Sequence, residues 1–223
     1  ISLGTHILSC GGVQDRAFNN LQEDLTVLAE RNFPVLDLAS GRQMTEKILQ
    51  ARQEQDSLGG LTQTALCGLP AGLGEPWFDS LEGLLAHALF SLGGIKGIEF
   101  GLGFALAASR GSQSNDPFRV EKGRVITQTN HNGGINGGLS NGMPIIFQCA
   151  VKPTPSIGQE QKTIDFVKGE NTTIAIEGRH DPAIVRRICP VIDSLTALVI
   201  ADLLAQRFGT DVLRKGRKEC NMD

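Results

Sequence analysis

The residues best suited to chemistry lie in three stretches of the second half of the chain. The first, NHNGGINGGLSNG at 130–142, holds five glycines and places Ser140 in a G-x-S-x-G pattern. Glycine-rich backbone can cradle an anionic ligand, because successive amides in positive-φ turns form anion-binding nests. G-x-S-x-G can also be the nucleophile elbow of a serine hydrolase. Asn-Gly pairs are equally typical of β-hairpin turns.

The context of Ser140 separates these interpretations. A nucleophile elbow needs a buried strand just before the serine and a helix just after it. Here further glycines precede Ser140, and Pro144 with the strand-like run IIFQCAV follows it. We therefore predict that Ser140 is a hydroxyl in a ligand-binding loop, with a serine hydrolase kept as an alternative. The number of glycines favours that loop over the simple hairpin, which also stays open.

The second stretch, KPTPSIG at 152–158, has the composition of a phosphate-binding segment. Lys152 supplies a cation, and Thr154 and Ser156 supply hydroxyl donors. Pro153 and Pro155 hold the backbone extended, because the ring fixes φ. An ordinary exposed loop is the other interpretation of this segment.

The third stretch, GRHDP at 178–182, is expected at the start of a long helix. Asp181 is a good N-cap and Pro182 a good first helical residue. Arg179 and His180 would then lie at the positive end of the helix, where a phosphate is favoured. Arginine can bind such an anion through two parallel hydrogen bonds. Asp181 could cap the helix and still face a ligand.

Apolar periodicity predicts the elements that position these stretches. Strand-like alternation occurs at 2–9, 62–68, 97–108, 145–151 and 172–177. Helical spacing links Leu21 to Leu28, Met44 to Ile48, Phe78 to Leu92 and Ile184 to Leu203, with Pro190 expected to kink the last helix. Strands come in runs, so we predict an α+β fold with antiparallel sheets packed on helices. GLGFAL at 101–106 lacks the third glycine of a dinucleotide motif and is interpreted as strand.

Composition restricts the class of protein. The 223 residues are 40% hydrophobic and 20% charged, with a net charge of −3, which suits a single domain over 1–223 and disfavours nucleic-acid binding. Five scattered cysteines form no C-x-x-C pair, which indicates neither disulfides nor a metal site and favours a cytoplasmic protein. We expect no membrane span or leader peptide. Because the chain opens on Ile1, we expect it to be a piece of a longer protein.

Taken together, four segments resemble the chorismate synthase family in order and spacing. They are PAGLGEPWFDSLEGLLAHALFSLGGIKGIEFG (70–101), NHNGGINGGLSNG, KPTPSIG and GRHDPAIVRRICPVID. The resemblance runs from Ile1 to about Gly209 and implies helices sandwiched between antiparallel sheets. It also implies that the chain is the C-terminal portion of the enzyme, without the early histidine and the arginine- and serine-rich motifs of the N-terminal part.

The resemblance implies a function and a set of site residues. The family converts 5-enolpyruvylshikimate 3-phosphate to chorismate and phosphate by anti-1,4-elimination, requires reduced FMN, and forms homotetramers. Asp181 matches an acidic residue that relays a proton with the flavin N5. The implied cofactor-binding residues are Gly93, Gly94, Gly137, Lys152, Pro153, Thr154, Pro155, Ser156 and Arg179.

Other positions qualify the resemblance. His131 and His180 are neighbours of the site, for which a structural role is expected. Gly93-Gly94 replaces a more common Asn-Ala pair, and Asp193 stands where glutamate is usual. We expect this chain alone to be inactive. The alternative from another class is a non-catalytic binding or assembly domain that retains the family sequence.

Overall fold

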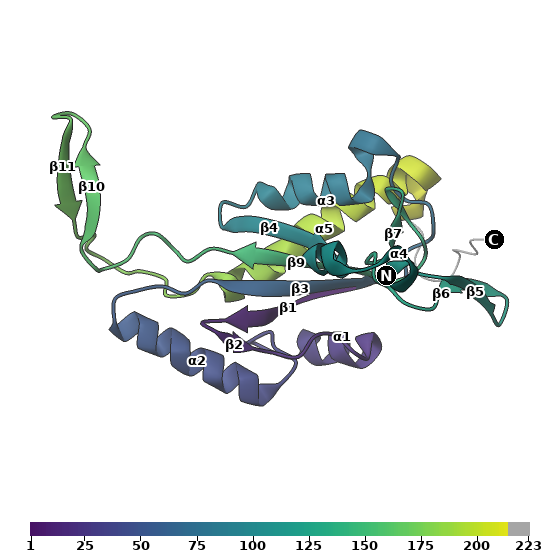
Figure 1. Cartoon of the computed structure of the whole chain (residues 1–223), viewed down its shortest axis with the longest axis horizontal. Coiled ribbons are helices and arrows are strands. Elements are labelled where there is room, and N and C mark those ends of the chain that lie inside the picture. Colours follow the sequence, from purple (N-terminus) through teal and green to yellow (C-terminus); the bar gives the residue numbers. More distant parts are fainter. Residues whose placement is uncertain (214–223) are drawn as a thin grey trace.

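An antiparallel sheet forms the centre of the computed structural model, which describes residues 1–213 (Figure 1). Its five strands run in the order β2-β1-β3-β9-β4, and each neighbouring pair is antiparallel. The strands are β1 (Ser2–Cys10), β2 (Val13–Gln14), β3 (Gly60–Cys67), β4 (Ile95–Phe100) and β9 (Ile145–Val151). The strands predicted at 2–9, 62–68 and 145–151 are confirmed, and so is the α+β class.

Helices lie on both faces of this sheet. They are α1 (Leu21–Ala29), α2 (Leu38–Gln53), α3 (Leu81–Phe90) and α5 (Val185–Phe208), and a further short helix, α4, spans Gly111–Ser114. Successive residues of β1 point to opposite faces. Thr5 bonds to Asp193 of α5, whereas a Cβ at Gly4 would meet Leu25 of α1. Helices α3 and α5 therefore share one face and α1 the other (Figure 1). Within residues 1–213, the five-stranded sheet covers the helix pair α3 and α5 from one side.

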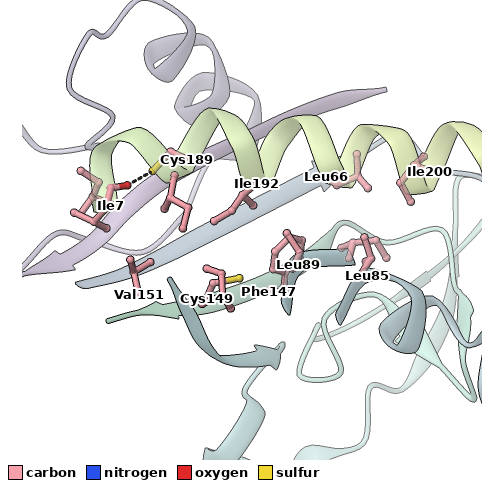
Figure 2. Close-up of a cluster of buried hydrophobic side chains, with 14 of the residues drawn as sticks. Ile7, Leu66, Leu85, Leu89, Phe147, Cys149, Val151, Cys189, Ile192 and Ile200 are labelled. Atoms are coloured by element: carbon pink, nitrogen blue, oxygen red, sulfur yellow. Dashed lines mark hydrogen bonds between the residues drawn. The ribbon is translucent and has the colours of Figure 1, made fainter. Parts of the chain in front are cut away.

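The core lies between the sheet and the helix pair α3 and α5 (Figure 2). Fully buried side chains from β9, such as Phe147 and Cys149, pack against Leu85 and Leu89 of α3 and Ile192 of α5. The pattern of β9 alternates strictly between buried and half-buried residues, as its sequence predicts. Apolar burial of this kind is the main stabilising contribution to the fold.

Helix α5 has the length and apolar composition of a membrane-spanning helix, although no such helix was expected from the sequence. The helix continues through Pro190. Its buried residues, among them Val185, Ile192 and Ile200, belong to the core shared with the sheet. The packing of these residues in the core therefore accounts for apolar positions in α5 without a bilayer.

Three two-stranded ribbons extend from the sheet: β5 (Phe118–Glu121) with β6 (Arg124–Thr127), β7 (Ile135–Asn136) with β8 (Leu139–Ser140), and β10 (Gln161–Asp165) with β11 (Glu170–Ile174). The first and last project from the body (Figure 1). The strand predicted at 172–177 overlaps β11 but ends at Ile174.

Two predictions of element boundaries are wrong. Strand β4 ends at Phe100, and Gly103–Ala108 forms a 3₁₀ helix instead of a strand, because Gly101 and Gly103 adopt positive φ and Glu99 accepts the Phe104 amide at 3.1 Å. The helix predicted from Phe78 to Leu92 begins later, at Leu81. Ser80 caps α3 by accepting the Gly83 amide at 3.0 Å, which leaves Phe78 exposed before the helix.

Candidate functional site

The predicted phosphate-binding segment lies at the end of the sheet where β9 stops. The Lys152 amide donates to the Gly94 carbonyl at 2.9 Å, so this segment runs beside the loop that follows α3. A Cβ at Gly94 would meet the tip of Ile184 at 2.8 Å, next to the start of α5, whereas a Cβ at Gly93 would have no neighbour within 4 Å in the described part of the chain. The structure thus brings Gly93, Gly94 and Lys152 together.

The segment itself is held by its backbone, which leaves side chains available. Ser57 donates to the Thr154 carbonyl at 2.6 Å, and Pro153 packs against Gly59. Pro155 is exposed, and its carbonyl accepts from Gln161 at 3.3 Å. Within residues 1–213, the buried Thr154 hydroxyl has no hydrogen-bond partner. Buried polar groups are normally hydrogen-bonded, so an unused hydroxyl here is suited to receive a ligand oxygen.

His180 joins the second predicted stretch to the third. Its Nδ1 lies 3.1 Å from Ser156 Oγ, and its Nε2 lies 2.8 Å from the Ile176 carbonyl oxygen. Lys152–Ser156 and Arg179–Asp181 are therefore neighbours in space, although an excursion through β10 and β11 separates them in sequence.

Asp181 does not act as the helix N-cap, which corrects the sequence prediction. Helix α5 begins at Val185 with Ile184 in the cap position. The Pro182 carbonyl accepts the Leu58 amide at 2.7 Å, a bond to the loop before β3 that holds this segment outside the helix. Asp181 Oδ1 accepts the Ala183 amide at 3.2 Å, and Oδ2 lies 3.0 Å from Arg187 Nη1.

An open pocket of about 940 Å³ lies beside this cluster. Arg179, His180 and Asp181 line this pocket, together with Arg52 of α2 and Asp56, which follows that helix. Residues 152–156 lie outside the lining and reach it through the Ser156–His180 contact. The cations Lys152 and Arg179, together with the Thr154 hydroxyl, make this arrangement suitable for binding a phosphate group.

The glycine stretch lies elsewhere, at the opposite end of β9. That strand has seven residues, which separates the two ends by roughly 20 Å at about 3.3 Å per residue. The Gly138 carbonyl accepts the Leu81 amide at 2.9 Å, at the start of α3. The structure therefore does not bring Gly137 together with Lys152 or Arg179.

Contacts within the protein account for the glycines. All five have positive φ, and Gly137 and Gly138 form the turn between β7 and β8. A Cβ at Gly133 would lie 2.5 Å from the Gly101 amide nitrogen, and one at Gly134 would lie 2.4 Å from the Pro144 carbonyl oxygen. A hairpin is therefore confirmed at Ile135–Ser140, while a ligand contact at Gly137 stays a prediction.

Asp116 anchors the loop. Burial alone would raise the pKa of this carboxyl, but hydrogen bonds from the Asn132 amide, the Thr129 hydroxyl and the His131 amide hold that pKa below its ordinary value. The negative charge is thus stabilised by groups of the loop itself.

Ser140 is a structural residue. It is buried, its hydroxyl donates to the Pro70 carbonyl at 2.7 Å and it accepts the Leu73 amide at 2.9 Å. These contacts tie the loop to the chain before α3. A catalytic serine needs an accessible hydroxyl beside a general base, so this geometry gives no support to the hydrolase alternative.

Two contacts in this region were not predicted. The first is the ion pair between Asp181 and Arg187, six residues further along the chain, for which no role was predicted. The second joins Asp193 of α5 to β1, because the Thr5 hydroxyl donates to Asp193 Oδ1 at 2.6 Å. Burial raises the pKa of Asp193.

Four of the five cysteines, Cys10, Cys67, Cys149 and Cys189, are free thiols, and Cys220 lies outside the described residues. Within residues 1–213, the structure places no group of three or more His, Cys, Asp or Glu side chains where it could hold a metal ion.

The fold and this cluster define an antiparallel α+β protein with a site suited to a phosphorylated ligand. The family model described as chorismate synthase matches residues 1–205. Chorismate synthase of Methanosarcina barkeri is 46% identical over 202 residues, 91% of this chain and 55% of the relative. That of Dehalococcoides mccartyi is 48% identical over 75% of this chain and 46% of the relative.

A comparison with a solved structure points to the same family. A crystal structure of chorismate synthase superposes with a TM-score of 0.76 at 26% identity, covering 94% of this chain and 59% of the other. The chain belongs to the chorismate synthase family, and it spans about half the length of the curated relatives it matches.

Proposed function

We propose that this chain acts as the C-terminal portion of a chorismate synthase. The reaction is the anti-1,4-elimination of phosphate from 5-enolpyruvylshikimate 3-phosphate, with reduced FMN, to give chorismate for aromatic amino acid biosynthesis. Family membership supports the activity class, a lyase of the shikimate pathway. The observation that carries the proposal furthest is the cluster of Lys152, Thr154, Ser156, Arg179 and Asp181 around the Ser156–His180 contact.

In this proposal the chain's own residues bind a phosphate group and handle a proton. Lys152 and Arg179 provide positive charge, and the Thr154 hydroxyl, which has no partner among residues 1–213, provides a donor. Donors fixed before the ligand arrives stabilise developing charge well, because they need little reorganisation. Asp181 can hold a proton at Oδ2, where Arg187 is its present partner.

Bound reduced FMN would supply electron density to the substrate as the phosphate leaves. The open backbone at Gly93 and the Gly94 carbonyl lie beside Lys152 and fit a planar ligand approaching closely. Gly137 is more distant, so its part in the proposal requires the far end of an extended ligand or a neighbouring copy in a homotetramer. We also propose that the enzyme is cytoplasmic and binds neither nucleic acid nor membrane.

Equilibrium titration of the chain with FMN tests the cofactor assignment. We expect Lys152→Ala and Arg179→Ala each to weaken binding about 10- to 100-fold, the effect of losing a hydrogen bond to a charged group. Lys162→Ala, on the exposed strand β10, is the matched control and should bind as the unchanged chain does. Equal affinities for all four proteins would contradict the proposed site.

The chain alone is proposed to be inactive, because residues of the N-terminal part would complete the site. Turnover of 5-enolpyruvylshikimate 3-phosphate by this chain with reduced FMN would contradict that. A non-catalytic assembly domain is the competing function. FMN with substrate at a hundred times the dissociation constant should add about 2.7 kcal/mol of stability. An unchanged melting temperature would favour the assembly domain.

A further inference from the structure

The two hydrogen bonds of His180 determine where its proton lies. Nε2 faces the Ile176 carbonyl oxygen at 2.8 Å, and a carbonyl can only accept. Nε2 therefore carries a proton. In the neutral ring Nδ1 is then an acceptor, so the Ser156 hydroxyl, 3.1 Å away, donates to it.

This arrangement directs the Ser156 proton towards the histidine and away from any ligand. An anion approaching Ser156 Oγ would meet oxygen lone pairs. If His180 takes up one proton, Nδ1 becomes a donor to Ser156 Oγ. The hydroxyl hydrogen is then free to turn towards the anion, and the ring adds a positive charge beside it.

We propose that His180 is a positioning residue that takes up one proton from solvent when a tetrahedral oxyanion binds beside Ser156. The inference rests on the proposed function only for the identity of that oxyanion, which is a phosphate group of cofactor or substrate, or free phosphate. Histidine suits this role because it changes charge between pH 5 and 8. Other charged groups face the same space: Arg52, Asp56, Glu177, Arg179, Asp181 and Arg187 line the pocket, and Lys152 precedes Ser156.

The proton can be observed directly by NMR of the chain labelled with ¹⁵N-histidine. Only four histidines contribute signals, and His180→Asn assigns the one of interest. Without ligand we expect a ring with its proton on Nε2 alone, facing the Ile176 carbonyl, with Nδ1 accepting from Ser156. Saturating sulfate, whose charge is constant over this range, should convert it to the doubly protonated ring. A ring that stays neutral under saturating sulfate, or sulfate that does not bind, overturns the inference.

The pH dependence of affinity provides a second readout, which a purely structural histidine would not change. Sulfate affinity should fall by about tenfold or more between pH 6 and pH 8, because binding that takes up one proton weakens by up to about tenfold for each unit of pH. For His180→Asn, which keeps a polar partner for Ser156 but cannot ionise, the change should stay below about twofold. His87→Asn, on the exposed side of α3, is the matched control and should keep the full pH dependence. Equal slopes in all three proteins refute the role of His180.

Parallel titrations separate this inference from the proposed function. FMN that competes with sulfate identifies the cofactor phosphate as the oxyanion, whereas competition by inorganic phosphate alone points to the substrate or free phosphate. If FMN does not bind while sulfate still protonates His180, the cofactor assignment fails and the inference stands. If FMN binds without proton uptake by His180, the cofactor assignment stands and the inference fails.

Discussion

Removing the Ser140 hydroxyl tests whether the glycine stretch is structural or catalytic. Ser140→Ala leaves the buried Leu73 amide without its acceptor, at a cost of about 1–3 kcal/mol, and removes a donor from the Pro70 carbonyl, worth about 0.5–1.5 kcal/mol. We therefore expect a total loss of about 2–4 kcal/mol in the free energy of unfolding. For a domain of this size, that lowers the melting temperature by roughly 5–15 °C.

Urea denaturation of the chain measures this loss through the shift of the midpoint at constant slope. Ser91→Ala is the control, because the Ser91 hydroxyl donates to the Ala88 carbonyl at an exposed position and should cost less than about 0.5 kcal/mol. If Ser140→Ala also costs less than that, the hydroxyl does not hold the loop, and the structural assignment of Ser140 is refuted.

Three further changes have expected outcomes. Asp193→Asn keeps an acceptor for Thr5. Because burial raises the pKa of Asp193, the stability that this carboxyl contributes to the unchanged chain is present at low pH and declines above about pH 4. At pH 7 the variant should therefore be at least as stable as the unchanged chain, as measured by urea denaturation. Gly138→Ala meets the Glu75 carbonyl at 2.9 Å and should destabilise more than Gly137→Ala, which faces open space, in the same assay. Asp181→Asn in the full-length enzyme should lower kcat about 100-fold or more while costing less than about 1 kcal/mol of stability, since asparagine can still accept the Ala183 amide and the Arg187 side chain is exposed.

Local patterns predicted most of the sheet and the helices. Strand β9 alternates because one of its faces packs on α3 and α5, so its period is visible in the sequence. The errors occurred where a residue outside the pattern decided the boundary. Ser80 starts α3 by capping it, and the preceding aromatic at Phe78, although in phase with the stripe, is exposed. Positive φ at Gly101 ends β4 in the same way.

The contacts of the candidate site are long-range, and no local period encodes them. Ser156 and His180 are 24 residues apart, and the ribbon of β10 and β11 between them gives no sign that they meet. The resemblance to a family selected both segments, but it assigned no contact between them. The Leu58–Pro182 bond, which moves the start of α5 away from Asp181, joins parts of the chain still further apart.

The glycine stretch shows the limit of composition most clearly. A run of glycines indicates that something must come close to the main chain or that φ must be positive. Both conditions hold here, yet the groups that come close are the protein's own: the Gly101 backbone, the Pro144 carbonyl and the Glu75 carbonyl. A ligand-binding nest and a close contact between two backbone segments of the protein both require glycine. Only the tertiary neighbours distinguish them. Of the pair Gly137 and Gly138, Gly137 has no neighbour within 4 Å of a Cβ in the described part of the chain, so it is the position where a ligand contact remains to be tested.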